Sequence, residues 1–336
     1  MSESSQARPL RAGVIGLGSM GQHHARVWAS LPGVDLVAVA DPRPAVRDRS
    51  AQATGARPHA DAETMLASEA LDLVSVAAPT SLHCELAVAA LRAGAHVLVE
   101  KPIAANRAEA QAMMDAAGSA GRLLTVGHVE RFNPAIVELR RRLAAGELGR
   151  IFEVRAERLG PFPDRIRDVG VVVDLAPHDL DVMRFLLRSD PVRVYAETEQ
   201  RIHTDHEDLF VGVMKFANGA VGLLDINWLT PTKQRRLSVT GEGGMYAADY
   251  ISQELVFTAN PSDGSVTAGP TEQRTIERRE PLLVELEAFA TAVRAGGPPP
   301  VDPREALVAL LLARAMVEAA NTGTALSGAT LEAALR

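Results

Sequence analysis

Short apolar runs alternate with amphipathic segments over the first 126 residues of the chain. The apolar runs have the length of buried strands and cover residues 12–15, 34–40, 71–77, 96–99 and 123–126. The segments between them follow the helical period, which predicts helices over residues 20–30, 45–54, 81–93 and 107–120. Strands that alternate with helices imply βαβ units. This part of the chain therefore predicts a doubly wound parallel sheet with helices on both faces.

The pattern changes after a helix predicted over residues 134–145, which a Gly146-to-Gly149 stretch ends. The strands predicted from there on cover residues 151–159, 192–202, 209–216, 220–229, 235–241, 245–249 and 254–258. No helical pattern separates the strands that follow residue 192, so we expect a large, mainly antiparallel sheet. Asn218-Gly219 indicates a hairpin within it. Helices over 282–295 and 304–321 close this α/β chain.

Composition narrows the range of functions. The chain has 336 residues, of which 47% are apolar and 23% charged, as in an ordinary globular protein of two domains. Its net charge of −7 argues against non-specific nucleic-acid binding, which needs a basic surface. The single cysteine, Cys84, excludes an intramolecular disulfide and favours a cytoplasmic location. The longest apolar stretch, 306–317, is too short to span a bilayer, and no signal-peptide core precedes the first strand, so we expect no membrane partner.

A glycine-rich loop joins the first predicted strand to the first helix. Gly16, Gly18 and Gly21 form a G-x-G-x-x-G pattern that allows a tight turn, a close approach of pyrophosphate and close packing of helix on strand. Asp41 ends the second strand, twenty residues after Gly21, where its carboxylate would bind ribose hydroxyls and repel a 2′-phosphate. NAD is therefore the expected cofactor. Arg43 leaves NADP open, because it can stack on adenine or bind a 2′-phosphate.

Other residues are expected along the same cofactor. Small side chains at the end of the third strand let a dinucleotide cross the sheet edge, and His83 in the next helix is expected at the cofactor edge or the surface. The remaining cofactor-binding candidates are Ser19, Met20, Ala78, Pro79, Thr80, Glu100, Lys101 and His128.

Lys101 follows an apolar strand, where parallel sheets bind their ligands. Oxidation of an alcohol requires a base within hydrogen-bond reach of the hydroxyl, and a partly buried lysine beside a nicotinamide can have a pKa low enough for this role. Glu100 can orient Lys101 or the nicotinamide. The alternative is a strand-end lysine that reaches into solvent.

Asp174 and His178 form a second candidate cluster. They are four residues apart, so on a helix they share one face. We expect the helix to begin near Pro177 and His178 to lie in its first turn. His178 can exchange a proton at neutral pH, and Asp174 can fix its tautomer. A metal site formed with Asp181 is the less favoured alternative, so no metal is expected.

Arginines precede this cluster in a loop rich in glycine and proline. Arginine forks match phosphate geometry, which favours an anionic substrate over plain surface charge. Polar residues at the end of the fifth strand are expected to face the same crevice. Besides Lys101, Asp174 and His178, the substrate-binding candidates are Arg131, Asn133, Arg158, Arg165 and Arg167.

The order of these motifs resembles the Gfo/Idh/MocA oxidoreductase family from end to end. The motifs are Gly16–Gly21, Glu100-Lys101-Pro102, the block 127–134 and Asp174 with His178. The resemblance implies a Rossmann domain, an open-faced C-terminal α/β sheet that often forms dimers or tetramers, and a catalytic set of Lys101, Asp174 and His178. The expected domains are 10–127 for NAD, 128–300 for substrate and oligomerisation, and 301–336 as a C-terminal helix and tail that pack back on the Rossmann domain.

The blocks 128–134 and 160–170 resemble those of UDP-N-acetylglucosamine 3-dehydrogenases within the family. This resemblance implies NAD-dependent oxidation of the C3 hydroxyl of a UDP-linked N-acetylhexosamine. The alternatives are a dehydrogenase or ketoreductase of a free sugar, a cyclitol or a sugar phosphate, an NAD-dependent glycosidase, and a non-catalytic NAD-binding regulator. A homodimer or homotetramer is expected, because an open sheet face needs a cover.

Overall fold

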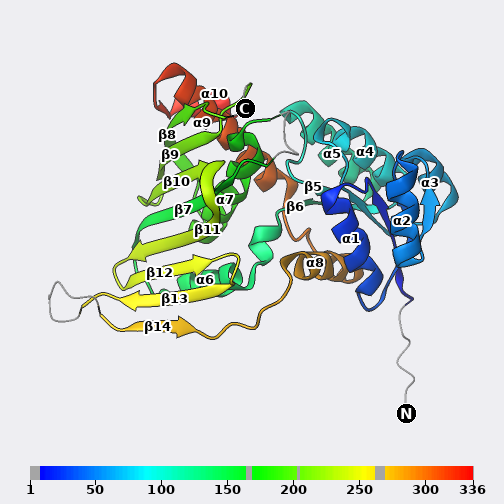
Figure 1. Cartoon of the computed structure of the whole chain (residues 1–336), viewed down its shortest axis with the longest axis horizontal. Coiled ribbons are helices and arrows are strands. Elements are labelled where there is room, and N and C mark those ends of the chain that lie inside the picture. Colours follow the sequence, from blue (N-terminus) through cyan, green and yellow to red (C-terminus); the bar gives the residue numbers. More distant parts are fainter. Residues whose placement is uncertain (1–7, 164–168, 203–204, 262–268, 336) are drawn as a thin grey trace, which may run out of the picture. The chain divides into compact units, whose positions relative to one another are not determined.

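Two compact units make up the chain in a computed structural model that describes residues 8–163, 169–202, 205–261 and 269–335 (Figure 1). Unit 1 contains Met1–Val129 and Glu280–Leu307. Unit 2 contains Glu130–Arg279 and Val308–Arg336. Within the described residues, no helix is both long enough and apolar enough to cross a lipid bilayer.

Unit 1 is built on a parallel six-stranded sheet of order β3-β2-β1-β4-β5-β6. Its strands are β1 (Leu10–Ile15), β2 (Val34–Ala40), β3 (Arg57–His59), β4 (Leu73–Val76), β5 (His96–Glu100) and β6 (Leu124–Gly127). Its helices are α1 (Ser19–Ser30), α2 (Pro44–Thr54), α3 (Ala62–Ser68), η1 (Thr80–Leu82), α4 (His83–Arg92), α5 (Arg107–Ala120) and α8 (Pro281–Ala295). This strand order is that of dinucleotide-binding Rossmann sheets, whose ligand crevice lies where the order reverses, between β1 and β4. The expected parallel sheet is confirmed.

The hydrophobic pattern of the sequence does not predict the short elements β3 and α3. The sequence of β3 is Arg-Pro-His, with no apolar run, and its side chains are exposed or half-buried. It lies at the edge of the sheet, where proline is tolerated because an edge strand needs only one set of ladder hydrogen bonds.

Helix α8 belongs to unit 1, which differs from the expected boundary at residue 300. Its apolar side, Leu282, Leu286 and Phe289, packs in a core that includes Trp28 of α1. The Phe289 and Trp28 rings lie 6.5 Å apart between centroids. Farther on, Thr125 of β6 exchanges hydrogen bonds of 3.0 and 3.1 Å with the backbone of Val301. The chain therefore returns to the Rossmann unit earlier than the expected boundary.

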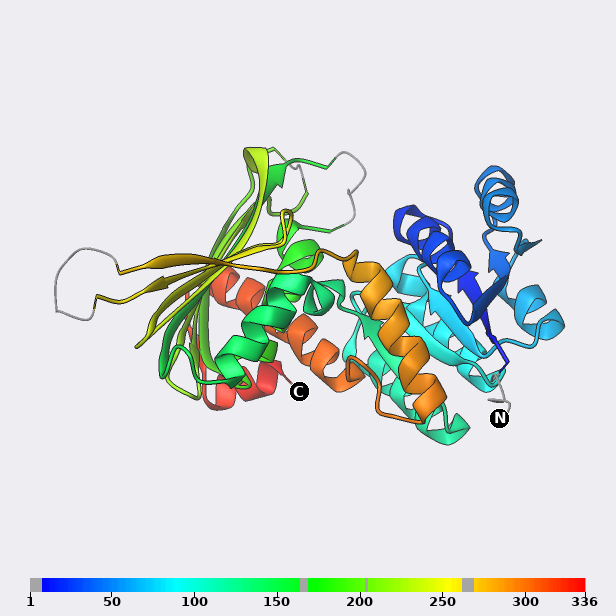
Figure 2. The ribbon, with the colours of Figure 1, turned by 90° about the horizontal axis from the view of Figure 1, so that it is seen from below.

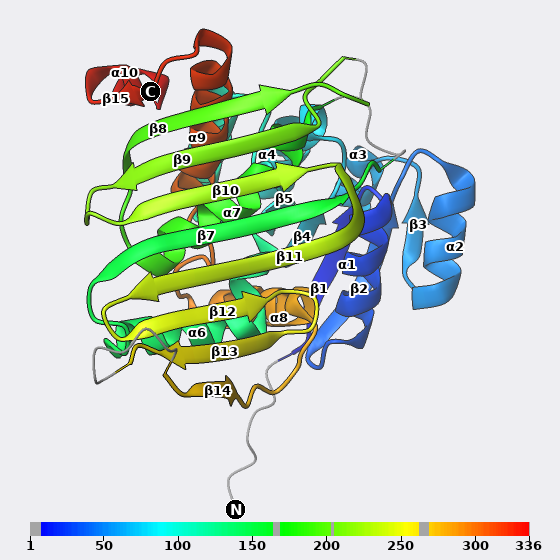
Figure 3. The same cartoon turned by 60° about the vertical axis from the view of Figure 1, so that its left-hand side comes forward.

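Unit 2 contains a nine-stranded sheet of order β14-β13-β12-β11-β7-β10-β9-β8-β15 (Figure 3). Its strands are β7 (Ile151–Pro161), β8 (Pro191–Glu199), β9 (Leu209–Phe216), β10 (Val221–Asn227), β11 (Leu229–Gly241), β12 (Gly244–Asp249), β13 (Glu254–Ala259), β14 (Thr271–Arg274) and β15 (Leu326–Ser327). Every recorded pair is antiparallel except β7 with β10, so the mainly antiparallel sheet is confirmed. Asn218 and Gly219, with φ +92° at the glycine, turn β9 into β10 as expected.

Helices pack on one face of this sheet. They are α6 (Pro134–Ala144), α7 (Val171–Leu187), the larger part of α9 (Pro303–Thr322) and α10 (Ala329–Ala334), and the short η2 (Val129–Phe132) precedes α6. Along β7, Val154, Ala156 and Arg158 are buried on the helical side, whereas Arg155 and Glu157 alternate with them on the other face. Figure 2 views the sheet of unit 2 on edge, with no helix of the described residues on that other face.

The C-terminal helix also differs from expectation. Leu312, Met316 and Ala319 of α9 are buried in the same apolar core as α6 and α7. The residues after 307 therefore belong to unit 2, whereas the sequence predicts a C-terminal segment 301–336 assigned to the Rossmann domain. The physical reason is the apolar face of α9, which the helical side of the large sheet covers.

Candidate active site

The glycine loop between β1 and α1 has the geometry that a dinucleotide requires. Gly16 has φ +86°, and a Cβ there would lie 2.7 Å from the backbone nitrogen of Ala78. A Cβ on Gly21 would lie 1.8 Å from the carbonyl oxygen of Gly16, so only glycine permits this approach of helix to strand. Apart from Gly18 itself and its two chain neighbours, no described residue has an atom within 4 Å of a Cβ built on Gly18. The loop therefore leaves space where a pyrophosphate would meet the first turn of α1, where Ser19 and Met20 are exposed.

Asp41 follows β2 and is already held in place. Its Oδ2 accepts a 2.8 Å hydrogen bond from the backbone of Leu17 in the glycine loop, and Arg43 donates to both carboxylate oxygens at 2.9 Å. Burial works to raise the pKa of Asp41, but the hydrogen bonds from Arg43 and Leu17 outweigh it and lower the pKa to about 2. The carboxylate is thus ionised at neutral pH. Because Arg43 is hydrogen-bonded to Asp41, the two side chains should influence the choice between NAD and NADP together.

His83 is buried, which excludes the surface, one of its two expected places. Its Nε2 lies 2.9 Å from the carbonyl oxygen of Ala78, and its Nδ1 lies 3.0 Å from that of Pro102. Burial lowers the pKa of His83 more than these carbonyls raise it, so the ring is neutral and donates to one of them. His83 connects the Ala78-Pro79-Thr80 turn, the expected cofactor-binding segment, to the segment that carries Lys101.

Lys101 is half-buried directly after β5, at the carboxyl end of a parallel strand as expected. Its backbone N–H donates to Glu100 Oε2 at 3.2 Å. Glu100 is the register partner of Gly127 on β6, and a Cβ on Gly127 would lie 3.1 Å from the Glu100 carboxyl group. Lys101 and the buried His128 therefore follow neighbouring strands at one edge of the sheet.

A series of buried hydrogen bonds connects Glu100 to the core of unit 1. Trp28 Nε1 donates to Ser75 Oγ at 2.8 Å, Ser75 Oγ lies 3.1 Å from His24 Nδ1, and His24 Nε2 lies 2.8 Å from Glu100 Oε1. Because the indole can only donate, the hydroxyl of Ser75 is free to donate to His24 Nδ1, which leaves Nε2–H for Glu100. Burial works to raise the pKa of Glu100, but His24 and then Lys101 outweigh it, and the net pKa is lowered.

These hydrogen-bonded residues, Trp28, Ser75, His24 and Glu100, are hard to recognise in the sequence. Ser75 stands inside an apolar strand and His24 on the buried side of α1, so an isolated polar residue at a core position is the available signal.

Asp174 and His178 lie one turn apart on α7, and both are half-buried. The helix begins at Val171, so the expected start near Pro177 is wrong, and His178 lies in the second turn. Glu207 explains this start. Its carbonyl oxygen accepts from the Val171 N–H at 2.9 Å, and its carboxylate accepts from Val172 at 3.2 Å, which caps the helix before the proline.

Two arginines expected to bind substrate form buried ion pairs within unit 2. Arg158 donates to both oxygens of Asp179 at 2.7 and 3.0 Å and to Glu130 at 3.0 Å. Burial works to lower the pKa of Arg158, but the charges of Asp179 and Glu130 and the hydrogen bonds to Asp179 together outweigh it, and the pKa is raised. Arg131 donates to both oxygens of Asp181 at 2.6 and 2.7 Å. Both guanidinium groups are paired with carboxylates of α7. The expectation that Arg131 and Arg158 bind the substrate directly is therefore corrected.

Asn133 is also structural. Its Oδ1 accepts from the backbone of Ala135 at 3.1 Å and caps α6, and its Nδ2 donates to the Tyr250 carbonyl at 3.0 Å. The substrate role expected of Asn133 is therefore corrected as well. Arg165 and Arg167 lie outside the described residues. No group of three or more potential metal ligands occurs in the part of the chain that the structure describes.

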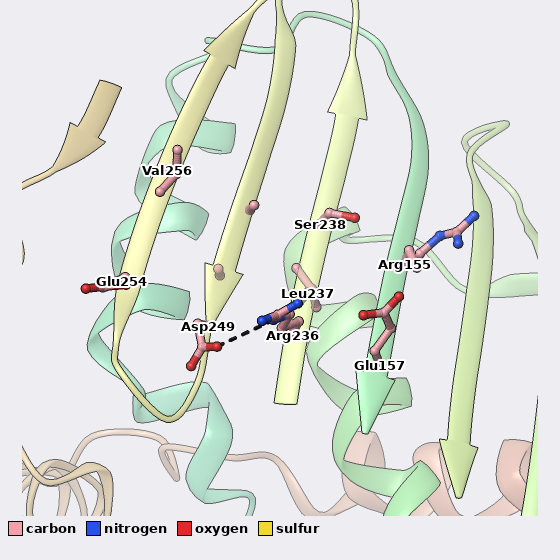
Figure 4. A pocket seen from close by; sticks show the side chains of 10 residues that line it. Arg155, Glu157, Arg236, Leu237, Ser238, Asp249, Glu254 and Val256 are labelled. Atoms are coloured by element: carbon pink, nitrogen blue, oxygen red, sulfur yellow. Dashed lines mark ion pairs between the residues drawn. The ribbon is translucent and has the colours of Figure 1, made fainter. Parts of the chain in front are cut away.

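A cavity of about 300 Å³ lies on the face of the large sheet that faces away from α7 (Figure 4). Side chains of β7, β11, β12 and β13 line it, among them Arg155, Glu157, Arg236, Asp249 and Glu254. Arg236 and Asp249 form an ion pair of 3.7 Å across it. Asp174 and His178 do not line this cavity, so it is separate from the candidate catalytic residues of α7.

Two family descriptions match the chain. Residues 10–128 match the Gfo/Idh/MocA oxidoreductase family with its NAD-binding Rossmann fold, and residues 136–247 match the Gfo/Idh/MocA C-terminal domain. The two matches correspond to the parallel sheet of unit 1 and to most of the mainly antiparallel sheet of unit 2.

Similar proteins span nearly the whole chain. A UDP-N-acetylglucosamine 3-dehydrogenase of Acidithiobacillus ferrooxidans is 32% identical over 92% of this chain and 98% of the relative. A solved structure of a protein with that name and source has a TM-score of 0.85 at 29% identity, covering 94% of this chain and 99% of that chain. A myo-inositol 2-dehydrogenase of Thermotoga maritima is 28% identical over 90% of this chain and 94% of the relative. The chain belongs to the Gfo/Idh/MocA family and is an NAD(P)-dependent oxidoreductase that acts on CH–OH groups of sugars or cyclitols.

Proposed function

We propose that this enzyme oxidises the C3 hydroxyl of a UDP-linked N-acetylhexosamine, such as UDP-N-acetylglucosamine, to the 3-keto sugar with NAD. The observation that carries the proposal is the 32% identity to a UDP-N-acetylglucosamine 3-dehydrogenase over 92% of this chain and 98% of that relative. The nucleotide-sugar substrate also agrees with the blocks 128–134 and 160–170 of the sequence.

We assign the proton chemistry to Lys101, Asp174 and His178. When bound, a nicotinamide dinucleotide supplies the hydride acceptor for this oxidation. Lys101 or His178 takes the hydroxyl proton, and Asp174, one turn away on α7, orients His178. The half-buried position of Lys101 and the anchoring of its backbone by Glu100 support a fixed location for its side chain.

The cofactor would be held by the glycine loop and by Asp41. The open space at Gly18 and the free N–H groups at the start of α1 fit a pyrophosphate. The ionised Asp41 supports NAD over NADP, because a carboxylate repels a 2′-phosphate.

A second candidate is oxidation of a free sugar or a cyclitol. The observation in its favour is the burial of Arg131 and Arg158 in ion pairs with α7, which removes two of the arginines expected to bind an anionic substrate. The relative named as a myo-inositol 2-dehydrogenase agrees with it.

Formation of NADH tests the two candidates directly. The purified enzyme is incubated with NAD and, in turn, UDP-N-acetylglucosamine, UDP-glucose and myo-inositol. We expect turnover with UDP-N-acetylglucosamine and a 3-keto product by mass spectrometry after borohydride trapping. Absence of turnover with every nucleotide sugar rejects the proposal, and turnover of myo-inositol alone establishes the second candidate. Release of free sugar without net NADH would identify a glycosidase.

We further propose that the enzyme is a cytoplasmic homodimer or homotetramer. Val211 and Val213 are more than 40% exposed on the open face of β9, which supports a cover from a second copy. Light scattering at micromolar concentration should give at least twice the 35.8 kDa of one chain. A monomeric mass would reject the oligomer.

A further inference from the structure

Arg235 lies on the same face of the large sheet as the candidate catalytic helix. It is the register partner of Arg158 in the antiparallel pair of β11 and β7. Residues directly opposite each other in such a pair project to the same side. Arg158 bonds to Asp179 of α7, so that side is the one covered by α7 (Figure 3). The neighbour Arg236 projects to the opposite, open face, where it pairs with Asp249.

Among the described residues, Arg235 differs from Arg158 and Arg131 in having no carboxylate acceptor. Both oxygens of Asp179 accept from Arg158, and both oxygens of Asp181 accept from Arg131. Arg235 is half-buried, and its guanidinium makes no hydrogen bond or ion pair with the described residues. Five N–H donors in a fixed fork are thus left for a ligand.

The electrostatic surroundings of Arg235 agree with an anion site. Burial and then the positive charge of Arg158 lower the pKa of Arg235, and the carboxylates of Glu130, Asp179 and Asp174 offset only part of this. A guanidinium remains charged at every physiological pH. A half-buried cation that its surroundings compensate incompletely is stabilised by a bound anion.

We infer that Arg235 binds the diphosphate of the nucleotide-sugar substrate, as a specificity-determining residue on the α7 side of the sheet. The inference rests on the proposed function. A diphosphate offers paired oxygens that match an arginine fork. Asp174 and His178 would then act on the sugar while Arg235 holds the anionic group, and a neutral cyclitol would gain nothing from Arg235.

Three variants test the inference. Arg235→Ala removes the fork, Arg235→Lys keeps the charge without the fork, and Arg236→Ala is a matched control one residue away on the opposite face. We expect Arg235→Ala to raise KM for UDP-N-acetylglucosamine about 10- to 100-fold with a smaller change in kcat. Arg235→Lys should recover part of the loss, and Arg236→Ala should stay within about twofold of the native enzyme. Circular dichroism checks that each variant is folded.

Binding of UDP and of uridine, measured by calorimetry, provides a readout that does not depend on turnover. The native enzyme should bind UDP more tightly than uridine, and Arg235→Ala should remove most of that difference. If the native enzyme oxidises UDP-N-acetylglucosamine and Arg235→Ala leaves its KM unchanged, the inference fails while the proposed function stands. If the native enzyme oxidises no nucleotide sugar, the proposed function fails, and equal binding of UDP by native and Arg235→Ala enzyme then overturns the inference separately.

Discussion

His24 Nε2 lies 2.8 Å from Glu100 Oε1, and the other oxygen of the same carboxylate accepts from the backbone of Lys101. One buried histidine is thus connected through one carboxylate to the segment that carries the proposed base. This connection can affect catalysis without contact between the substrate and His24 or Glu100. Glu100 holds the backbone of Lys101, and His24 holds Glu100.

Replacement of His24 should therefore impair turnover and stability together. In His24→Ala the Glu100 carboxylate loses a buried partner, so we expect the free energy of unfolding to fall by about 1–3 kcal/mol. The pKa of Glu100 should rise, and the acidic limb of the kcat profile should move to higher pH, with little change in affinity for NAD. The exposed neighbour His23 provides the control His23→Ala. An unchanged pH profile in His24→Ala would show that the histidine is structural only.

Lys101 and His178 should each be required for turnover. Loss of a general base typically costs roughly 100- to 10,000-fold in rate, so Lys101→Met and His178→Asn should lower kcat by amounts in this range. Affinity for NAD, measured by fluorescence titration, should stay within about threefold for His178→Asn, because His178 belongs to unit 2. Full activity in Lys101→Met would contradict the proposed mechanism.

Asp41 and Arg43 should act together in cofactor choice. Asp41 holds the Arg43 guanidinium through two hydrogen bonds of 2.9 Å. Asp41→Ala removes the repulsion of a 2′-phosphate and releases Arg43 to bind it, so the ratio of kcat/KM for NADP over NAD should rise about 10- to 100-fold. The double variant with Arg43→Ala should lose most of that gain. Steady-state kinetics with both cofactors measures these ratios, and equal gains in the single and double variants would argue against a role for Arg43.

The same carboxylate should make stability depend on pH. The pKa of Asp41 is lowered to about 2 in the folded enzyme, below its ordinary value of 3.8. The stabilisation is therefore complete above about pH 4 and is lost as pH falls towards 2. It amounts to about 1–2 kcal/mol, since Arg43 is exposed and screened. Urea unfolding should show the gap between native enzyme and Asp41→Asn shrinking from pH 6 to pH 3. A gap independent of pH would assign the effect to another cause.

Helix α8 should stabilise unit 1. Phe289 is fully buried against Trp28, and Phe289→Ala should lower the free energy of unfolding by about 3–5 kcal/mol. Glu287 is exposed on the same helix, and Glu287→Ala should change stability by less than about 0.5 kcal/mol. Thermal denaturation with and without NAD compares the two variants. Equal melting temperatures would contradict the assignment of α8 to this core.

The sequence predicted the features that depend on local pattern. The glycine loop, the strand that ends before Lys101, the Asn218-Gly219 hairpin and the mainly antiparallel sheet all follow from spacing along the chain. Partners distant in sequence could not be predicted in the same way. Arg158 had the residue type of a phosphate ligand, and only the fold brings Asp179 of α7 to it. Likewise, the apolar face of α8 gave no sign of which unit would cover it.

The contact between Gly170 and Glu207 limits how this enzyme can vary or be engineered. A Cβ on Gly170 would lie 2.1 Å from the Glu207 carboxyl group, which itself caps the helix that carries Asp174 and His178. A larger residue at 170 therefore either displaces the Glu207 carboxylate or needs a shorter residue at 207, and both changes give up the hydrogen bond from Val172. Natural variation at these positions should be correlated, and mutant libraries of the active site should randomise the two codons jointly.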